Sequence, residues 1–133
     1  MNWSNAADVA RLNLVAAWLG LLLAFLSGSV LGVGFHQEGW LGGYASFQRR
    51  LYRLGHISFF GLAAVNFMFF VTARLGGLKG SGTPVASIAL LIGAISMPAC
   101  CFLMAHFPRV RLLFAVPVLS LLFGAAVTLF ALL

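Results

Sequence analysis

Acidic residues are almost absent from this chain. Its 133 residues include only two carboxylates, Asp8 and Glu38, and only 8% of its residues are charged. Both carboxylates lie outside the long apolar runs of the sequence. Proton-coupled pumps and small drug exporters need an ionisable group within the bilayer, so this scarcity of acid argues against those classes.

Sequence motifs for catalysis and metal binding are also missing. The chain contains no HExxH, P-loop or GxGxxG motif, and no Ser–His–Asp set with a plausible placement. The two cysteines, Cys100 and Cys101, are adjacent within an apolar run. Adjacent cysteines rarely satisfy disulfide geometry, and their spacing fits neither covalent haem attachment nor structural zinc. We therefore interpret them as small buried hydrophobic residues, and we do not expect an enzyme acting alone.

Long apolar runs dominate what is present. Hydrophobic residues make up 62% of the chain, whose mean hydropathy is +1.07. The runs cover about residues 12–35, 54–73, 85–107 and 112–133. Each run reaches the roughly 20 residues that a helix needs to cross a bilayer. We predict an all-α integral membrane protein with four transmembrane helices in an up-down bundle, forming one domain over residues 1–133.

Basic residues predict the orientation of these helices. The formal net charge is +6, but the basic residues are dispersed among the connections, so no nucleic-acid partner is expected. The connections 36–53 and 106–111 hold five arginines, Arg49, Arg50, Arg53, Arg109 and Arg111, whereas the other side holds three basic residues. The positive-inside rule then places these two connections in the cytoplasm and both termini outside the cell membrane. The Arg49–Arg53 cluster abuts a span, which is typical of an orientation signal that contacts lipid headgroups.

Two polar residues are predicted to cap helices. Ser46 precedes a segment that continues without a break into the second apolar run, so we expect it to be the N-cap of that helix. Thr83 is followed by Pro84, which is typical of an N-cap with proline at the first helical position.

Small residues recur at every fourth position of the first span. A small-xxx-small pattern lets two helix backbones approach closely, either with a neighbouring helix or with another subunit. Asn66 lies near the middle of the second span and is expected to form an interhelical hydrogen bond. The residues predicted to act in helix packing are Ala16, Gly20, Ala24, Gly28, Gly32 and Asn66.

Three histidines fall at the ends of three spans, on one side of the membrane. His36, His56 and His106 are most simply interpreted as interface residues with packing roles. Imidazoles that project from facing helices also suit a b-type haem, or the headgroup of a quinone, with His56 and His106 as the binding residues. A transition-metal site that uses all three histidines is a further alternative.

The absence of ionisable groups within the spans and the small extramembrane mass favour a non-catalytic protein. We interpret the chain as an accessory or assembly subunit of a larger membrane complex, with the lipid bilayer and other membrane subunits, or a second copy, as its partners. The first alternative is a redox subunit that binds haem b or quinone. The second is a small channel or lipid-handling protein, with a sparse polar lining formed by Asn66, Ser58, Ser87, Ser96, Ser120 and Thr128.

Overall fold

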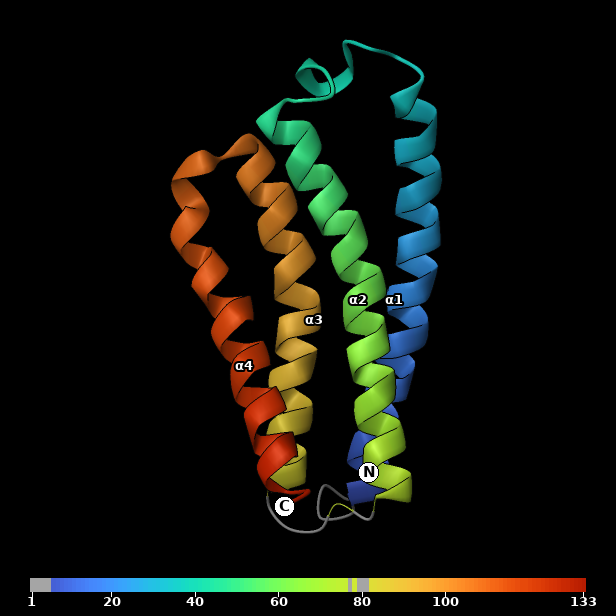
Figure 1. The fold of residues 1–133 in the computed structure, drawn as a ribbon, viewed down its shortest axis with the longest axis vertical. Coiled ribbons are helices and arrows are strands. Elements are labelled where there is room, and N and C mark those ends of the chain that lie inside the picture. The colour runs from blue at the N-terminus through green and yellow to red at the C-terminus, as the bar shows by residue number, and fades with distance from the viewer. Residues whose placement is uncertain (1–5, 77, 79–81) are drawn as a thin grey trace.

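A computed structural model describes residues 6–76, 78 and 82–133 of the chain (Figure 1). Its helices are α1 (Ala6–Phe35), α2 (Phe47–Leu75), α3 (Gly82–His106) and α4 (Ala115–Phe130), with short 3₁₀ segments η1 (Trp40–Gly42) and η2 (Pro108–Phe114). The described residues contain no strand. Four segments, the last of them combining η2 with α4, are long and apolar enough to cross a membrane. The prediction of an all-α protein with four such helices is confirmed.

The start of α2 confirms the expected cap. Ser46 is the N-cap residue, and its hydroxyl accepts a hydrogen bond from the backbone N–H of Arg49 at 3.1 Å. The cap predicted for Thr83 is wrong. α3 already includes Gly82, so Thr83 lies inside the helix, and its buried hydroxyl has no hydrogen-bond partner among the described residues. A residue caps a helix only from outside its first turn, where the side chain can reach the free N–H groups.

The α-helical part of the fourth apolar run begins at Ala115 rather than at Leu112, because η2 occupies the preceding residues. Pro117 has no backbone N–H, so it cannot bond to the carbonyl of Leu113 as an α-helix would require. That carbonyl instead accepts a hydrogen bond from the thiol of Cys100 at 3.5 Å. Proline chemistry thus accounts for the displaced start of α4.

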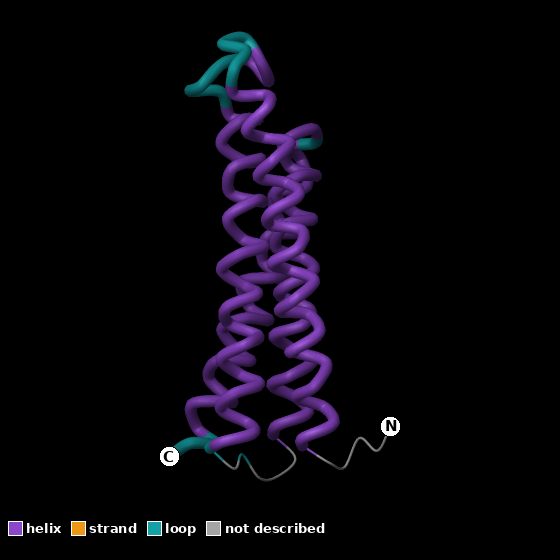
Figure 2. Tube along the Cα trace, turned by 90° about the vertical axis from the view of Figure 1, so that its right-hand side faces the viewer, coloured by secondary structure: helices purple, strands orange, loops and turns teal. Residues whose placement is uncertain are grey.

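The four helices alternate in direction and lie roughly in a row, in the order α1, α2, α3, α4 (Figures 1 and 2). Each packs on the next along the row, and α1 also has a smaller contact with α3. Among the described residues, α4 has no substantial contact with α1 or α2. The four-helix arrangement is therefore open on the side of α4.

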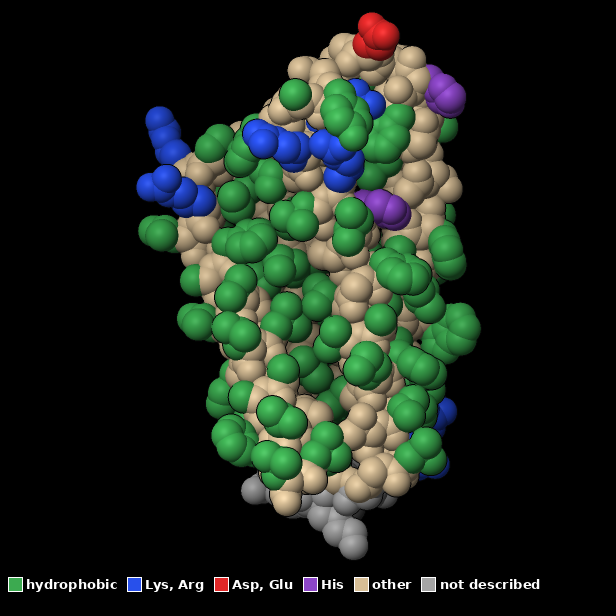
Figure 3. Space-filling view, in the orientation of Figure 1, with side chains coloured by type: hydrophobic (Ala, Val, Ile, Leu, Met, Phe, Trp, Pro, Cys, Tyr) green, Lys and Arg blue, Asp and Glu red, His purple; other side chains and the backbone are tan. Residues whose placement is uncertain are grey.

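Charge divides the molecule along its length. The connections between α1 and α2 and between α3 and α4 lie together at one end, which we call the loop end (Figure 1). Most basic side chains, the single acidic residue of these connections and the histidines gather towards this end, whereas hydrophobic side chains cover the middle (Figure 3). The structure is that of a multi-pass membrane protein.

Candidate functional site

Three polar side chains from three helices meet inside the apolar interior. Asn13 of α1 donates a hydrogen bond through Nδ2 to Oδ1 of Asn66 on α2 at 2.8 Å, and Ser87 of α3 donates to Oδ1 of Asn13 at 2.5 Å. Asn66 also donates to the carbonyl of Leu62 at 2.8 Å. All three side chains are completely buried. We call Asn13, Asn66 and Ser87 the polar clamp, because these bonds join α1, α2 and α3 near the end opposite the loop end.

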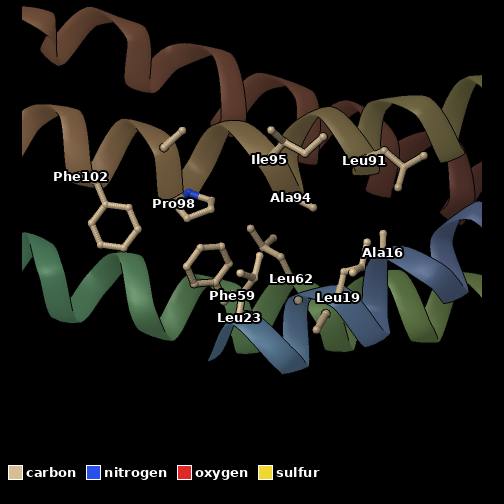
Figure 4. Close-up of a pocket in the computed structure, with 13 residues that line it drawn as sticks. Ala16, Leu19, Leu23, Phe59, Leu62, Leu91, Ala94, Ile95, Pro98 and Phe102 are labelled. Carbon is tan, nitrogen blue, oxygen red and sulfur yellow. The ribbon is translucent and has the colours of Figure 1, made fainter. Parts of the chain in front are cut away.

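On the loop-end side of the polar clamp lies an apolar groove of about 440 Å³, whose wall is formed by α1, α2 and α3 (Figure 4). We call it the lateral groove. Its wall begins one turn from the clamp, at Ala16 on α1 and Leu91 on α3, and continues to Phe102. Small side chains of α3, such as Ala94 and Ala99, leave this space open between the helices. The groove offers packing surface but no chemical group for a reaction.

Two hydrogen-bonded pairs lie one to two turns beyond the last groove residues of their helices, towards the loop end. Ser27 of α1 pairs with Nδ1 of His56 on α2 at 3.0 Å, and the hydroxyl of Tyr52 on α2 pairs with Nε2 of His106 on α3 at 2.8 Å. Phe102 forms the end of the groove wall nearest the second pair, and its ring contacts Tyr52 at a centroid distance of 5.3 Å. We call Ser27, His56, Tyr52 and His106 the polar tier.

Two of the three histidines, His56 and His106, belong to the polar tier, where they are held in different ways. The His56 ring is packed against α1, so that a Cβ added at Gly28 would lie 2.9 Å from its Cε1 atom. His106 is engaged by Tyr52 instead, and His36 is exposed just after the end of α1. The described residues contain no group of three potential metal ligands. Since His56 and His106 each bond to a side chain of another helix, this geometry favours packing roles over a shared haem.

The small residues of α1 differ in their surroundings. A Cβ at Gly20 would lie 3.0 Å from Cβ of Ala63 on α2, which makes Gly20 a point of close approach between α1 and α2. Ala24 is buried, whereas Gly32 is exposed, and a Cβ added there would have nothing within 4 Å. Gly20 and Gly28 thus pack against α2 of the same chain. The sequence pattern alone does not distinguish this contact from packing against another subunit.

Arg49 is buried at the loop end, with 4% of its surface exposed. Its guanidinium lies over three aromatic rings, with distances from Cζ to the ring centroid of 4.6 Å for Phe35, 5.9 Å for Trp40 and 5.6 Å for Tyr44. Such cation–π contacts stabilise a desolvated arginine. Its Nε atom has no hydrogen-bond partner in the part of the chain that the structure describes. Arg49 therefore differs from the headgroup-contacting arginine that the sequence suggested.

Sequence reasoning missed Asn13 and the burial of Arg49. Asn13 carried a usable signal, because it is the one amide in an otherwise apolar first span and could be matched with Asn66. The signal at Arg49 was the preceding series of aromatic residues at 35, 40 and 44. Neither signal identifies which helix faces which, so the contacts themselves required the structure.

Comparisons of the chain with protein-family models, with curated protein sequences and with solved structures found no match.

Proposed function

We propose that the protein is a small non-catalytic integral membrane protein that acts as an accessory or assembly subunit of a larger membrane complex. The observation that supports this proposal is the open side of the helix row. In the most apolar stretch of α3, 39% of the residues are buried within the chain, whereas in that of the span containing α4 only 11% are buried. α4 is the helix that the chain itself covers least.

Packing physics explains why an uncovered helix matters. Lipid tails are as apolar as leucine, so helices in a membrane are held by close packing and by interhelical polar bonds. The polar clamp supplies such bonds to α1, α2 and α3. For α4 the corresponding side-chain bond runs from Ser120 to the backbone carbonyl of Ala89, at 2.5 Å. A partner helix would add the packing that α4 does not receive from its own chain.

A second hollow supports the same assignment. It has a volume of about 360 Å³ and lies between α2, α3 and α4, with Val65, Met97 and Val118 in its wall. Side chains that border a void lose the dispersion contacts they would have in a filled interior. Side chains of a neighbouring subunit that enter this hollow would restore those contacts.

The test is the composition of the particle obtained when the protein is taken from its membrane with its lipids, without detergent. We expect a stoichiometric second membrane protein, or a second copy of this chain, measured by native mass spectrometry. Replacing the exposed Ala126 of α4 by tryptophan (A126W) should release that partner. The matched variant A64W, on an exposed position of α2, is the control. A particle that contains one chain and no stoichiometric partner would contradict the proposal.

A further inference from the structure

The lateral groove opens sideways to the surroundings of the helices. At its rims, Leu23 of α1 is 44% exposed and Ile95 of α3 is 74% exposed. Its interior, bounded by Leu62, Ala94 and Pro98, is apolar (Figure 4). A long hydrocarbon chain could therefore enter from the bilayer without crossing a polar barrier.

The length of the groove corresponds to one leaflet. Along α3 its wall extends from Leu91 to Phe102, which is about 16 Å at 1.5 Å per residue. The hydrocarbon core of a bilayer is about 30 Å thick, so one leaflet contributes about 15 Å. The polar clamp closes the groove at the end farther from the loop end, since Asn13, Asn66 and Ser87 each lie three or four positions from a residue of its wall.

The polar tier stands where such a chain would meet its headgroup. Tyr52 and His106 provide hydroxyl and imidazole groups beyond the ring of Phe102, on the loop-end side of the groove. A further hollow of about 480 Å³ begins at His106, and its wall includes Arg109. From the groove towards the loop end, apolar space is followed by hydrogen-bonding groups and then by positive charge. This order matches the acyl chain, the ester group and the phosphate of a phospholipid.

Charge decides which phospholipid fits. The loop end carries five arginines, three in the first turns of α2 and two in η2, and one carboxylate, Glu38. The buried Arg49 has only aromatic rings around its guanidinium among the contacts that the structure describes. Clusters of basic residues beside transmembrane helices attract anionic lipids. The excess of positive charge favours an anionic headgroup over a zwitterionic one.

We propose that the lateral groove binds one acyl chain of an anionic phospholipid from the leaflet at the loop end, whose ester group reaches Tyr52 and His106 and whose phosphate is held by Arg109. Binding of this lipid does not depend on whether the chain also has a protein partner.

The test is native mass spectrometry of the full chain in detergent titrated with phosphatidylglycerol or with phosphatidylcholine of the same acyl chains. We expect one molecule of phosphatidylglycerol to bind about fivefold more tightly than phosphatidylcholine, as expected for one close arginine. R109Q should remove this preference while retaining the bound chain. A99F fills the groove, and we expect it to weaken binding of both lipids about tenfold through lost packing contacts. The same substitution at an exposed position outside the groove, A64F, is the matched control and should bind like the unmodified chain.

Three outcomes would overturn the proposal. Equal binding of the two lipids by the unmodified chain would indicate non-selective surface lipid, and equal effects of A99F and A64F would place the lipid elsewhere. Tighter binding of a long-chain quinone, added as a third ligand, would assign the groove to quinone. The helical circular dichroism of each variant is measured first, and A94L, which narrows the same groove, replaces A99F if that variant does not fold.

Discussion

Asn66 joins two helices while it also satisfies its own amide. It accepts a hydrogen bond from Asn13 and donates one to the carbonyl of Leu62, so both ends of its side chain are paired. An unpaired polar group costs free energy when it is buried, and these residues are completely buried. At the scale of single residues, the polar groups of the clamp therefore hold α1, α2 and α3 together.

Replacing Asn66 by alanine (N66A) should destabilise the fold, because Nδ2 of Asn13 then loses its acceptor. We expect the free energy of unfolding to fall by about 0.6 to 1.7 kcal/mol, from the average to the largest value measured for interhelical bonds in membranes. Reversible unfolding in mixed micelles measures this change. S96A is the control, because the hydroxyl of Ser96 bonds within its own helix to the carbonyl of Ile92, at 2.6 Å. Equal effects of N66A and S96A would show that the clamp contributes no interhelical stability.

Gly28 and Gly32 form a matched pair on α1. A Cβ at Gly28 would approach Cε1 of His56 to 2.9 Å, whereas a Cβ at Gly32 would have no neighbour within 4 Å. We expect G28A to destabilise the protein by about 1 to 3 kcal/mol through overpacking. G32A should instead be neutral or stabilising by about 0.5 to 1 kcal/mol, because alanine is the better helix former. The thermal midpoints of the two variants compare them directly, and a G28A midpoint at or above that of G32A would contradict the close approach.

Elements differ in how far the sequence predicts them. The N-cap Ser46 could be predicted because capping depends on residues within one turn. The polar clamp could not, since Asn13 and Ser87 are 74 positions apart and their contact depends on how α1, α2 and α3 pack. The 3₁₀ segment before α4 depends on Pro117 together with a thiol from another helix. The sequence therefore predicts the helices and one local cap, whereas the candidate groove follows from tertiary packing.

The attachment of α4 rests on glycine contacts with α3. A Cβ at Gly124 would lie 3.0 Å from the side chain of Leu90 and 3.2 Å from the carbonyl of Ala86. G124A should therefore push α4 away from α3, and the thiol of Cys100, which bonds to the chain just before α4, should become accessible. We expect the rate of Cys100 modification by a maleimide to rise about tenfold, corresponding to a loss of about 1.4 kcal/mol in the closure of this contact.

The control for G124A is G61A, because a Cβ at Gly61 would have nothing within 4 Å. Both variants carry the same two cysteines, so Cys101 is replaced by serine in all samples and the signal reports Cys100 alone. Unchanged modification rates in G124A would show that α4 tolerates the added methyl group without leaving α3.

At the scale of the whole molecule, the connections 36–46 and 107–114 lie together at one end (Figure 1). Five arginines belong to the loop end, and the other side has Arg11, Arg74 and Lys79, of which Lys79 lies outside the described residues. Arg49 is buried among aromatic rings, but its charge still counts towards the loop end.

This distribution predicts that the loop end is cytoplasmic and that the C-terminus lies outside. A phosphatase that is active only after export should therefore be active when fused after Leu133, and a fluorescent protein that matures only in the cytoplasm should remain dark there. The variant R50Q/R109Q/R111Q leaves two arginines at the loop end against three basic residues on the other side, so we expect it to insert in the reverse orientation in a large fraction of molecules. R74Q increases the original asymmetry and should keep the original orientation. Fluorescence from the fusion to the unmodified chain would show that the orientation is the reverse, and would place the arginines and the polar tier in the outer leaflet.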